Sequence, residues 1–592
     1  MILQSLHAYY ERRQKLDDPA RRLPPVGLVE QAIGYLIEIE RDGRFVQLLR
    51  TGEIEGGKHR AARFLVPQGV KRTSGVMPNL LWDNVAYALG VGEQGNPDRI
   101  REQHAAFVAK LEALPEPAVS DAGVRAVLTF LADASESQRL RDSPLWDELI
   151  AANSVVTFRL RDDENGALVC QRPNVIPTQI SDDSPPDDDE PAVCLVTGRR
   201  ESIAVLHPAI KGVWGAQPTG GNIVSFNQEA FVSYGKAQGC NAPVGVTTAQ
   251  TYTTALNALL TRDSKNRIQV GDASTVFWSE LDNDPVEAEF SNLFSEAKKS
   301  DDPDEDASKV EALLHAIHSG RYQDDAAGRC FHVLALAPNS ARIAIRDYQC
   351  VPLGELAKRI VEHFSDLAIA RAPHDPQRLS LFRLLCAVAV QGKADNIPPL
   401  LGGEVLRSVL CGLNYPRTFL NAAIVRCRAE RKVTYARAAI LKAWFNRDLR
   451  HRQTDDKEFN EMLDPSNFNP AYRLGRLFAA LERIQEDAQP GINATIRDRY
   501  YGSASSTPAA VFSGLLRLAQ HHLSKLKDRP GIKVHRERLL GEIVQGLSDF
   551  PAHLALADQG RFALGYYHQR QHFFTKANPE SAKTDIEVEE TE

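Results

Sequence analysis

The spacing of hydrophobic residues predicts both strands and helices in the first 160 residues. After an opening helix, IGYLIEIERDGRFVQLLRT (33–51) contains two alternating hydrophobic runs on either side of Arg41-Asp42-Gly43. Two such runs joined by an Asp-Gly turn are typical of a β-hairpin. A strand is predicted at VVTFRL (155–160), and helices are predicted near residues 100–114, 119–133 and 144–152. The pattern indicates an N-terminal α+β domain over residues 1–155.

Residues 156–350 combine short strand-like runs with a helix, which indicates a central α+β region with mixed or antiparallel sheets. The helical pattern lies at 241–262. The predicted strands are AVCLVTG (192–198), VSFN (224–227), RIQV (267–270), TVFWSE (275–280), FHVLALAP (331–338) and ARIAIRDYQ (341–349).

From residue 351 onward the pattern becomes helical, with no convincing strand. The helix predicted at 508–527 shows the arrangement, because Pro508 suits its first position and a hydrophobic stripe runs along one side. On another face Arg517, His521 and Lys525 recur every four residues. We therefore expect residues 351–592 to form an all-α C-terminal helical bundle that ends in a disordered acidic tail at 580–592.

The net charge of −7 hides an uneven distribution. Residues 161–190 and 281–306 carry net charges of −7 and −8, so the rest of the chain carries +8. The acidic loops at 181–190 and 281–306 are typical of solvated segments. Residues 411–580 hold 26 basic and 17 acidic residues, a net charge of +9. The bundle is therefore expected to have basic outer faces, carried in part by Arg473, Arg476, Arg497, Arg499, Arg517, His521 and Lys525.

Several classes of protein do not fit the sequence. The N-terminus lacks the basic-then-apolar layout of a secretory signal, and no run of about 18 uncharged apolar residues is present. The eight cysteines form no Cys-x-x-Cys pair, which fits reduced thiols in the cytoplasm. The adjacent His521 and His522 would point about 100° apart on a helix, and Asp498 lies between arginines, so neither indicates a metal site. We expect no membrane span, no metal, no cofactor and no catalytic site.

The stretch KGVWGAQPTGGNIVSFNQEAFVSYGKAQGCNAPVG (211–245) holds seven glycines and two lysines but a single carboxylate. It is not a nucleotide-hydrolysing phosphate loop, because Ala230 and Ala237 stand where the Gly-x-x-x-x-Gly-Lys-Ser/Thr pattern needs a glycine and a hydroxyl. Glycine permits close approach of a backbone, and amides can read base edges. We predict a DNA-contacting surface formed by Lys211, Gln217, Thr219, Gly220, Gly221, Asn222 and Asn227.

A second candidate surface lies in the basic segment 41–72, which has eight arginines and lysines against three acids. Such cations neutralise phosphates and supply sequence-independent affinity for nucleic acid. The loop QGVKRTSGVMPN (68–79) adds hydroxyls, a glycine and an amide, and its candidate reading residues are Lys71, Arg72, Thr73, Ser74 and Asn79. The sequence does not rank this loop against 211–227, and an ordinary surface turn is the alternative for each.

With these residues in view, the chain resembles the large subunit of the type I-C CRISPR Cascade complex, a Csd-type CRISPR-associated protein. The matching blocks are GAQPTGGNIVSFNQEAFVSYGKAQGCNAPVG followed by TYTTALNALL, then ARIAIRDYQ, GRLFAALERIQEDA and NATIRDRYYGSASSTPAAVFSGLLRLAQHHLSKL. They are spread over essentially the whole chain, whereas the two acidic loops look like variable insertions.

The resemblance implies a non-catalytic subunit at one end of an RNA-guided surveillance complex. Such a subunit would recognise the protospacer-adjacent motif in double-stranded target DNA, aid duplex opening, stabilise the R-loop and help recruit the helicase-nuclease. Guide pairing reads most of the sequence in these complexes, while protein reads a short motif and the backbone. The implied partners are the other Cascade backbone subunits and, indirectly, the CRISPR guide RNA. The loops 68–79 and 211–227 would contact the motif, and the basic residues of the bundle would contact the DNA backbone and the displaced strand.

The resemblance also implies that the C-terminal bundle can be made separately as a small subunit. Met462 is a candidate start and would give a product of 131 residues. A buried linker methionine, or a start at a nearby non-methionine codon, is the alternative. Two other functions stay open from the sequence, a nuclease or guide-RNA-processing enzyme and a purely structural scaffold subunit.

Overall fold

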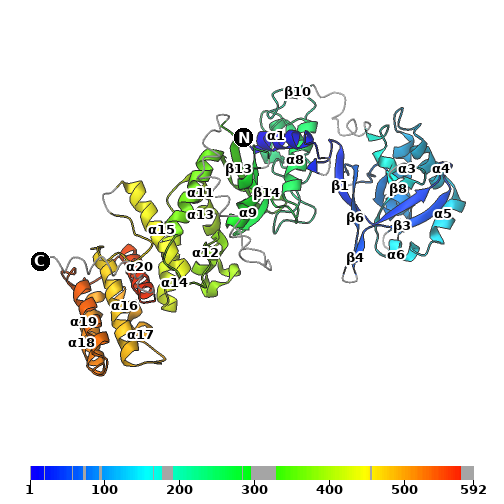
Figure 1. Ribbon diagram of the computed structural model, residues 1–592. Helices are drawn as coiled ribbons and strands as arrows, with labels where there is room; N and C mark the ends of the chain where they lie inside the picture. The colour runs from blue at the N-terminus through cyan, green and yellow to red at the C-terminus, as the bar shows by residue number, and fades with distance from the viewer. Residues whose placement is uncertain are drawn as a thin grey trace. The chain divides into compact units, whose positions relative to one another are not determined.

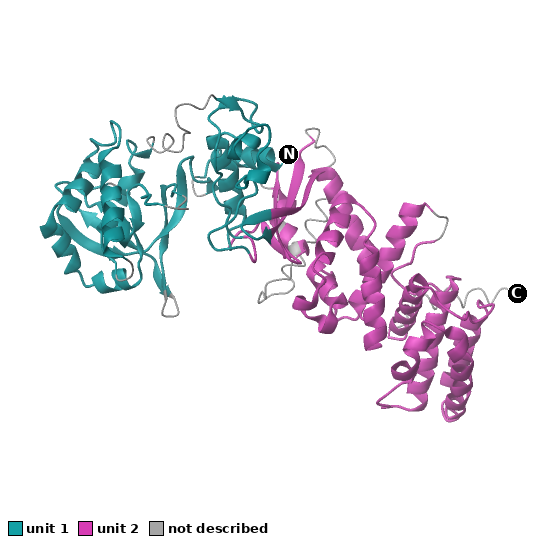
Figure 2. Ribbon diagram, turned by 180° about the vertical axis from the view of Figure 1, so that it is seen from behind, with its two compact units in different colours: residues 1–212, 216–262, 338–343 teal, residues 213–215, 263–337, 344–592 magenta. Residues whose placement is uncertain are grey.

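A computed structural model describes residues 2–18, 21–55, 58–70, 75–92, 96–163, 166–176, 191–282, 284–294, 328–453 and 457–574. The chain forms two compact units (Figure 2). Unit 1 comprises residues 1–212, 216–262 and 338–343, and unit 2 comprises residues 213–215, 263–337 and 344–592. The acidic loop 181–190 and the expected disordered tail 580–592 lie outside the described residues.

The first sheet of unit 1 confirms the predicted hairpin. Strand β2 (Tyr35–Ile39) pairs antiparallel with β3 (Phe45–Arg50). Strand β8 (Val155–Leu160) pairs parallel with β2, and β7 (Trp82–Asn84) completes the order β3-β2-β8-β7. All five residues of β2 are buried, as expected for a central strand with both faces covered.

Helices pack on this sheet and complete a hydrophobic core in which Phe130 and Phe158 meet edge to face (Figure 1). They are α2 (Val85–Leu89), α3 (Pro97–Glu112), α4 (Ala122–Ala132), α5 (Ala134–Arg141) and α6 (Trp146–Ala151). Periodicity predicted α3, α4 and α6, whereas it missed the short helices α2 and α5. Two further antiparallel pairs belong to unit 1: β1 (Leu28–Ile33) with β6 (Ala62–Pro67), and β4 (Glu53–Glu55) with β5 (Lys58–Arg60).

A second part of unit 1 is built on two helices that are far apart in the sequence. Helix α1 (Ile2–Gln14) lies beside α8 (Val246–Leu259), and His7 Nδ1 is 2.8 Å from Thr251 Oγ1 (Figure 1). The predicted helix at 241–262 is thus confirmed, with bounds a few residues narrower.

The chain before α8 is largely irregular, which corrects two strand predictions. The run 192–198 keeps only the two-residue strand β9 (Ala192–Val193), paired with β10 (Arg200–Glu201), and 224–227 forms no strand. The neighbouring backbone instead makes single bridges, Ile210 with Gly221 and Asn222 with Arg342, so no continuous ladder extends through VSFN.

Unit 2 begins with the four strands predicted at its start, which form one sheet in the order β11-β12-β13-β14. They are β11 (Arg267–Val270), β12 (Ala273–Ser279), β13 (Cys330–Asn339) and β14 (Arg342–Pro352). Helix α9 (Pro285–Phe294) packs on β11 and β12 through buried Val286, Phe290 and Leu293. This corrects the expectation of a solvated loop over 281–306, because the first half of that segment supplies apolar residues to the core.

The rest of the described part of unit 2 is helical, as predicted for residues beyond 351. Its α-helices are α11 (Leu353–Leu367), α12 (Leu381–Val388), α13 (Leu401–Cys411), α14 (Arg417–Glu430), α15 (Tyr435–Arg452), α16 (Pro470–Ala488), α17 (Ile496–Ala504), α18 (Pro508–Ser524), α19 (Pro530–Val544) and α20 (Leu556–His572). The α+β region followed by a helical C-terminal region confirms the predicted fold class. The three-region division at 155 and 350 stays a prediction.

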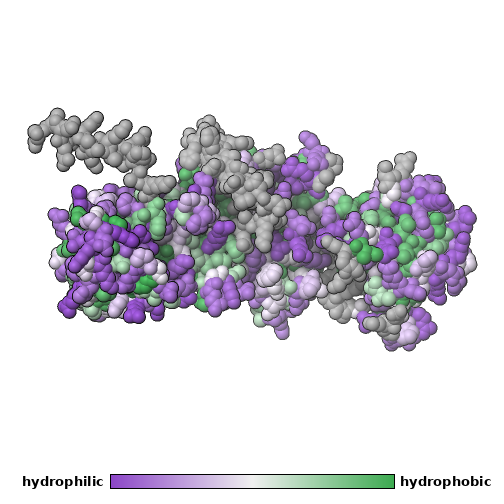
Figure 3. Space-filling model, turned by 60° about the horizontal axis from the view of Figure 1, so that its bottom comes forward, coloured by the Kyte–Doolittle hydropathy of each residue, from purple (hydrophilic) through white to green (hydrophobic). Residues whose placement is uncertain are grey.

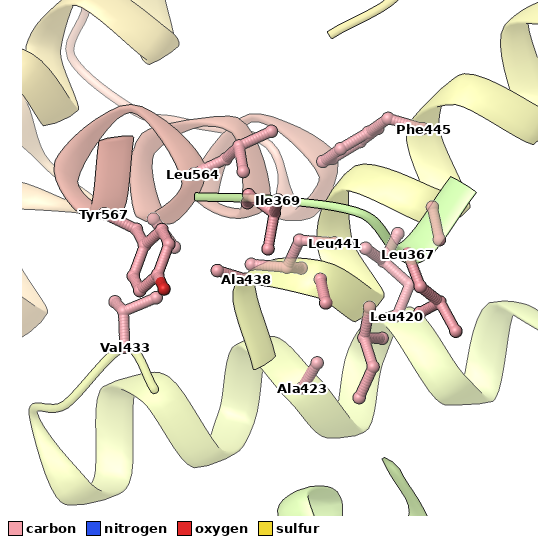
Figure 4. Close-up of a cluster of buried hydrophobic side chains, with 14 of the residues drawn as sticks. Leu367, Ile369, Leu420, Ala423, Val433, Ala438, Leu441, Phe445, Leu564 and Tyr567 are labelled. Atoms are coloured by element: carbon pink, nitrogen blue, oxygen red, sulfur yellow. The ribbon is translucent and has the colours of Figure 1, made fainter. Parts of the chain in front are cut away.

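Helix α20 is buried on two sides. Toward α16, glycines allow a very close approach, because a Cβ at Gly475 or Gly565 would lie 2.0 Å from a carbonyl oxygen of the other helix. On its other side, Leu564 and Tyr567 lie in a hydrophobic cluster with Ala438 and Leu441 of α15 (Figure 4). The second contact ties α16–α20 to the preceding helices.

The face of the molecule in Figure 3 is mostly hydrophilic, with hydrophobic residues in small separate spots. Among the described residues, no helix combines the length and the apolar character needed to span a bilayer.

Candidate nucleic-acid interface

The glycine-rich stretch forms a projecting turn at residues 217–220. The Gly220 N–H donates to the Gln217 carbonyl at 2.9 Å, and Gly221 and Ile210 exchange both backbone hydrogen bonds at the base of the turn. Gly220 has φ +87°, and a Cβ there would lie 2.6 Å from the Ile210 carbonyl oxygen, so this position requires glycine. The side chains of Gln217 and Thr219 are exposed at the tip.

Asn222 supports the turn from inside. Its side chain is buried, and Nδ2 donates to the carbonyls of His207 at 2.8 Å and Pro208 at 3.2 Å. Its carbonyl accepts a hydrogen bond from Ile343 N at 3.1 Å. Gly221 is buried as well, and a Cβ there would lie 3.2 Å from the Ala341 carbonyl. The structure therefore places Gly221 and Asn222 beneath the exposed surface, where they position it.

Asn227 and Lys211 lie at the edges of the same surface, both exposed. The Lys211 N–H donates to Asn257 Oδ1 at 2.8 Å, which fixes the backbone and leaves the ammonium group at the surface. Asn227 Oδ1 accepts a hydrogen bond from the Arg342 guanidinium. Lys211, Gln217, Thr219 and Asn227 are thus exposed along this segment, and their contact with DNA stays a prediction.

Arg342 is a residue of this surface that sequence reasoning missed. It is the first residue of β14, in the part of that hairpin that belongs to unit 1, and its guanidinium carbon lies 4.5 Å from the centre of the Phe231 ring. A guanidinium stacked on an aromatic ring keeps its edge donors in a fixed plane. In the sequence, Arg342 is one residue of the predicted strand 341–349, which indicates nothing about the loop it meets.

A buried histidine lies under the turn without adding charge. His207 Nδ1 is 2.6 Å from the hydroxyl of Tyr252, and burial lowers the pKa of His207 to about 4. The imidazole is therefore neutral near pH 7. Any positive charge at this surface comes from Lys211 and Arg342 instead.

The second candidate loop is described only at its ends. Lys71, Arg72, Thr73 and Ser74 lie outside the described residues. Asn79 is buried, and its Oδ1 accepts a hydrogen bond from Val70 N at 2.9 Å, closing the base of the loop. Asn79 therefore positions this loop and does not itself present an amide to solvent.

The basic residues of the helical region divide into exposed and buried sets. Arg499, Arg517, His521 and Lys525 are exposed; Arg517 and His521 lie four residues apart on α18, and Lys525 follows at its C-cap. Arg497 is half-buried, with Nε 3.8 Å from the buried carboxylate of Glu482.

Arg473 and Arg476 are not on an outer face, which corrects the expectation for these two. Arg473 donates to the carbonyls of Asn467, Glu542 and Ile543 at 3.0–3.3 Å, and Arg476 donates to Pro465 and Gln569 at 3.2 Å. Both are buried because α18, α19 and α20 all pack around α16. Their guanidinium groups satisfy backbone carbonyls at helix ends and loops.

Within the described residues, no group of three or more histidine, cysteine or acidic side chains is placed to hold a metal ion. All eight cysteines are free, and burial raises the pKa of the Cys170 thiol to about 12, which makes it a poor nucleophile. His332 lies beside an acid and a hydroxyl, with its ring nitrogens 3.0 Å from Glu280 Oε1 and from the Tyr348 hydroxyl. Since His332 is buried and both nitrogens are engaged, it offers no proton-transfer group to a substrate.

Comparison with known proteins places the chain among the CRISPR-associated proteins. It belongs to the family described as CRISPR-associated protein Cas_Csd1, whose model matches residues 6–574. This match confirms the resemblance to a Csd-type large subunit that was inferred from the sequence. Membership of this family implies a complex with other Cascade subunits. A search of the curated proteins finds no match.

Proposed function

We propose that this chain is the non-catalytic large subunit of a type I-C RNA-guided surveillance complex, and that it recognises the protospacer-adjacent motif in double-stranded DNA. It aids duplex opening, stabilises the R-loop and helps recruit the helicase-nuclease in the cytoplasm. The guide RNA is contacted indirectly, through the complex. The family supports the assembly, and the glycine-rich surface supports the recognition.

The observation that carries the proposal is the turn 217–220 held over buried Asn222. Gln217 and Thr219 present uncharged donors and acceptors at its tip, and the segment 211–228 contains no carboxylate. Side-chain amides and hydroxyls can hydrogen-bond to base edges, whereas a carboxylate would repel the phosphates. Lys211 at the edge suits a phosphate contact. The turn is thus a rigid, neutral reading element with a positive border.

The loop 68–79 is proposed as a second contact. Its described base is fixed by Asn79 and by the Trp82 indole, which donates to the Pro67 carbonyl at 2.8 Å. Lys71, Arg72, Thr73 and Ser74 are proposed to contact the motif or the adjacent backbone. The exposed residues Arg499, Arg517, His521 and Lys525 are proposed to contact the displaced strand.

A separately made small subunit beginning at Met462 fits the local structure. Before it, the Phe459 backbone exchanges hydrogen bonds of 2.8 and 2.9 Å with the Asn446 side chain of α15. After it, Asp464 Oδ1 caps the turn at Ser466, and Asn469 caps the first turn of α16. The start therefore falls between a segment held by α15 and the segment that begins α16.

Among the described residues, no specific observation favours the competing enzymatic function. A purely structural role is separated from motif recognition by a binding assay. We would measure the affinity of the assembled complex for two duplexes that differ only in the adjacent motif, using the wild type and the double variant Gln217→Ala/Asn227→Ala. Loss of discrimination by roughly five- to 100-fold, with normal assembly, supports recognition by this turn. Unchanged discrimination contradicts it.

A further inference from the structure

A tight turn at residues 233–236 holds a tyrosine almost entirely in solvent. Ser233 and Lys236 form an antiparallel bridge, and the Lys236 N–H donates to the Ser233 carbonyl at 3.0 Å. The two central residues, Tyr234 and Gly235, have φ of +52° and +72°, as in a type I′ turn. The side chain of Tyr234 is 98% exposed.

Tyrosine is an unfavourable residue for this position. The first central position of a type I′ turn favours asparagine, aspartate or glycine, because a bulky residue at positive φ is strained. The ring of Tyr234 does not offset that strain by packing, since it is almost fully exposed. Strain of this kind is characteristic of residues that act on a partner.

One side chain holds the turn in place. Asn241 Oδ1 accepts a hydrogen bond from Ser233 N at 3.0 Å, and Asn241 Nδ2 donates to the carbonyls of Lys236 at 2.8 Å and Gln238 at 3.0 Å. Both arms of the turn are therefore fixed to the same amide. The ring is presented on a preorganised support, so binding to it costs little ordering of the backbone.

The surroundings of the turn suit a polyanion. Its exposed neighbours are Val232, Ser233, Gly235 and Lys236, and the Arg342 guanidinium stacks on Phe231 a few residues earlier. The stretch 211–245 contains only one carboxylate.

We propose that Tyr234 is a stacking platform for an unpaired nucleobase of single-stranded DNA, with Lys236 contacting the neighbouring phosphate. Duplex bases stack on one another, so an isolated protruding ring fits a base that has left the duplex. Every base has a π-face, which makes this contact tolerant of sequence. The inference rests on the proposed function, because opening of the duplex is what supplies the unpaired strand.

The test uses the full-length protein and a fluorescein-labelled single-stranded oligothymidylate, with affinity measured by anisotropy. Tyr234→Gly is expected to weaken binding by roughly five-fold or more, because base–aromatic stacking is lost. Tyr234→Phe keeps the ring and is expected to bind as the wild type does. Glycine accepts positive φ, so Tyr234→Gly is not expected to lower the melting temperature. In a strand carrying 2-aminopurine, the wild type quenches the fluorescence and Tyr234→Gly does not.

Three results would overturn the proposal. The first is an unchanged affinity of Tyr234→Gly for the single strand, and the second is an equal loss of that affinity in Tyr234→Phe. The third is a loss of subunit assembly in Tyr234→Gly without loss of strand affinity, and this result would assign the ring to a protein partner. Failure of the proposed function looks different, because the wild-type complex would then fail to distinguish duplexes by their adjacent motif.

Discussion

The guanidinium of Arg342 lies over the ring of Phe231, with its carbon 4.5 Å from the ring centre, although the two residues are far apart in the sequence. The same guanidinium donates to Asn227 Oδ1. One arginine at the start of β14 therefore joins an aromatic residue and an amide of the glycine-rich stretch. Each prediction below depends on such a placement of a side chain.

Arg342→Lys should disturb this junction although it keeps the charge. Lysine cannot stack as a plane, and an exposed cation–π contact contributes about 0.5–1 kcal/mol. We expect a lower free energy of unfolding by about that amount and weaker binding to motif-bearing duplex. Arg199→Lys, at another exposed arginine of unit 1, is the matched control. Equal behaviour of the two variants in denaturant titration and duplex binding would show that the junction has no role.

Asn222→Ala should act on stability, whereas Gln217→Ala should act on recognition. The first leaves the buried carbonyls of His207 and Pro208 without their donor, which costs about 1–3 kcal/mol. The second removes an exposed side chain, so its free energy of unfolding should change by less than about 0.5 kcal/mol. Thermal unfolding of both variants checks this, and a destabilised Gln217→Ala would be inconsistent with an exposed tip.

Arg473→Met should lower stability because Arg473 is buried, whereas Arg517→Gln should change only strand binding because Arg517 is exposed. The first leaves several carbonyls unsatisfied and should lower the free energy of unfolding by about 1–3 kcal/mol. The second should leave stability unchanged and reduce the slope of log affinity against log salt by about one, if Arg517 meets a phosphate. Salt titrations of strand binding check this, and an unaltered slope removes α18 from the interface.

Acid should destabilise the protein through buried histidines, among them His207, His363 and His568. Burial lowers the pKa of His207 to about 4, and burial together with a nearby cation lowers the pKa of His363 and His568 to about 3. The unfolded value is about 6.5, so the unfolded chain binds more protons below that pH. Stability should be constant above about pH 6.5 and decrease toward pH 4, by up to about 1.4 kcal/mol per pH unit for each histidine. Melting temperatures between pH 7.5 and 5 check this.

His522→Leu should make the decrease of stability at acid pH shallower. Burial, Lys525 and His521 lower the pKa of His522, and neither of its ring nitrogens has a hydrogen-bond partner in the structure as described. Leucine fills a similar buried volume and cannot be protonated. The variant should match the wild type near pH 7.5 and exceed it near pH 5. Parallel profiles for the two proteins would show that His522 does not titrate in this range.

Met462→Ala should abolish a separate small subunit without harming the full chain. Met462 is 47% exposed, so alanine removes the start codon at little cost in stability. Intact mass spectrometry of the purified complex should show a product of 131 residues with the wild type and none with the variant. Persistence of that product with the variant would place the start elsewhere.

Local patterning predicted the regular elements well, because their hydrogen bonds and periodicity are set by nearby residues. The strand at Val155–Leu160 and the hairpin around Asp42-Gly43 are examples. The strand predicted at 224–227 was wrong, since the nearby backbone bridges involve Gly221 and Asn222 and no ladder runs through 224–227. A short run between glycines carries too little information to distinguish these cases.

Composition predicted the candidate surface, but it did not predict which of the candidate residues are buried. Asn79, Asn222, Arg473 and Arg476 are buried for tertiary reasons that no spacing reveals. Arg342 was missed for the same reason, because it reaches Phe231 from another element. Sequence indicates which residue types gather in a segment, whereas packing decides which of them face solvent.

The central claim is that this subunit reads the adjacent motif in duplex DNA. The most direct measurement compares the complex assembled with and without this chain, titrated against target duplexes with the correct and with an altered motif. The account predicts that the complete complex prefers the correct motif and that the complex without this chain binds both duplexes weakly and equally. Equal preference for the correct motif in both complexes would contradict it.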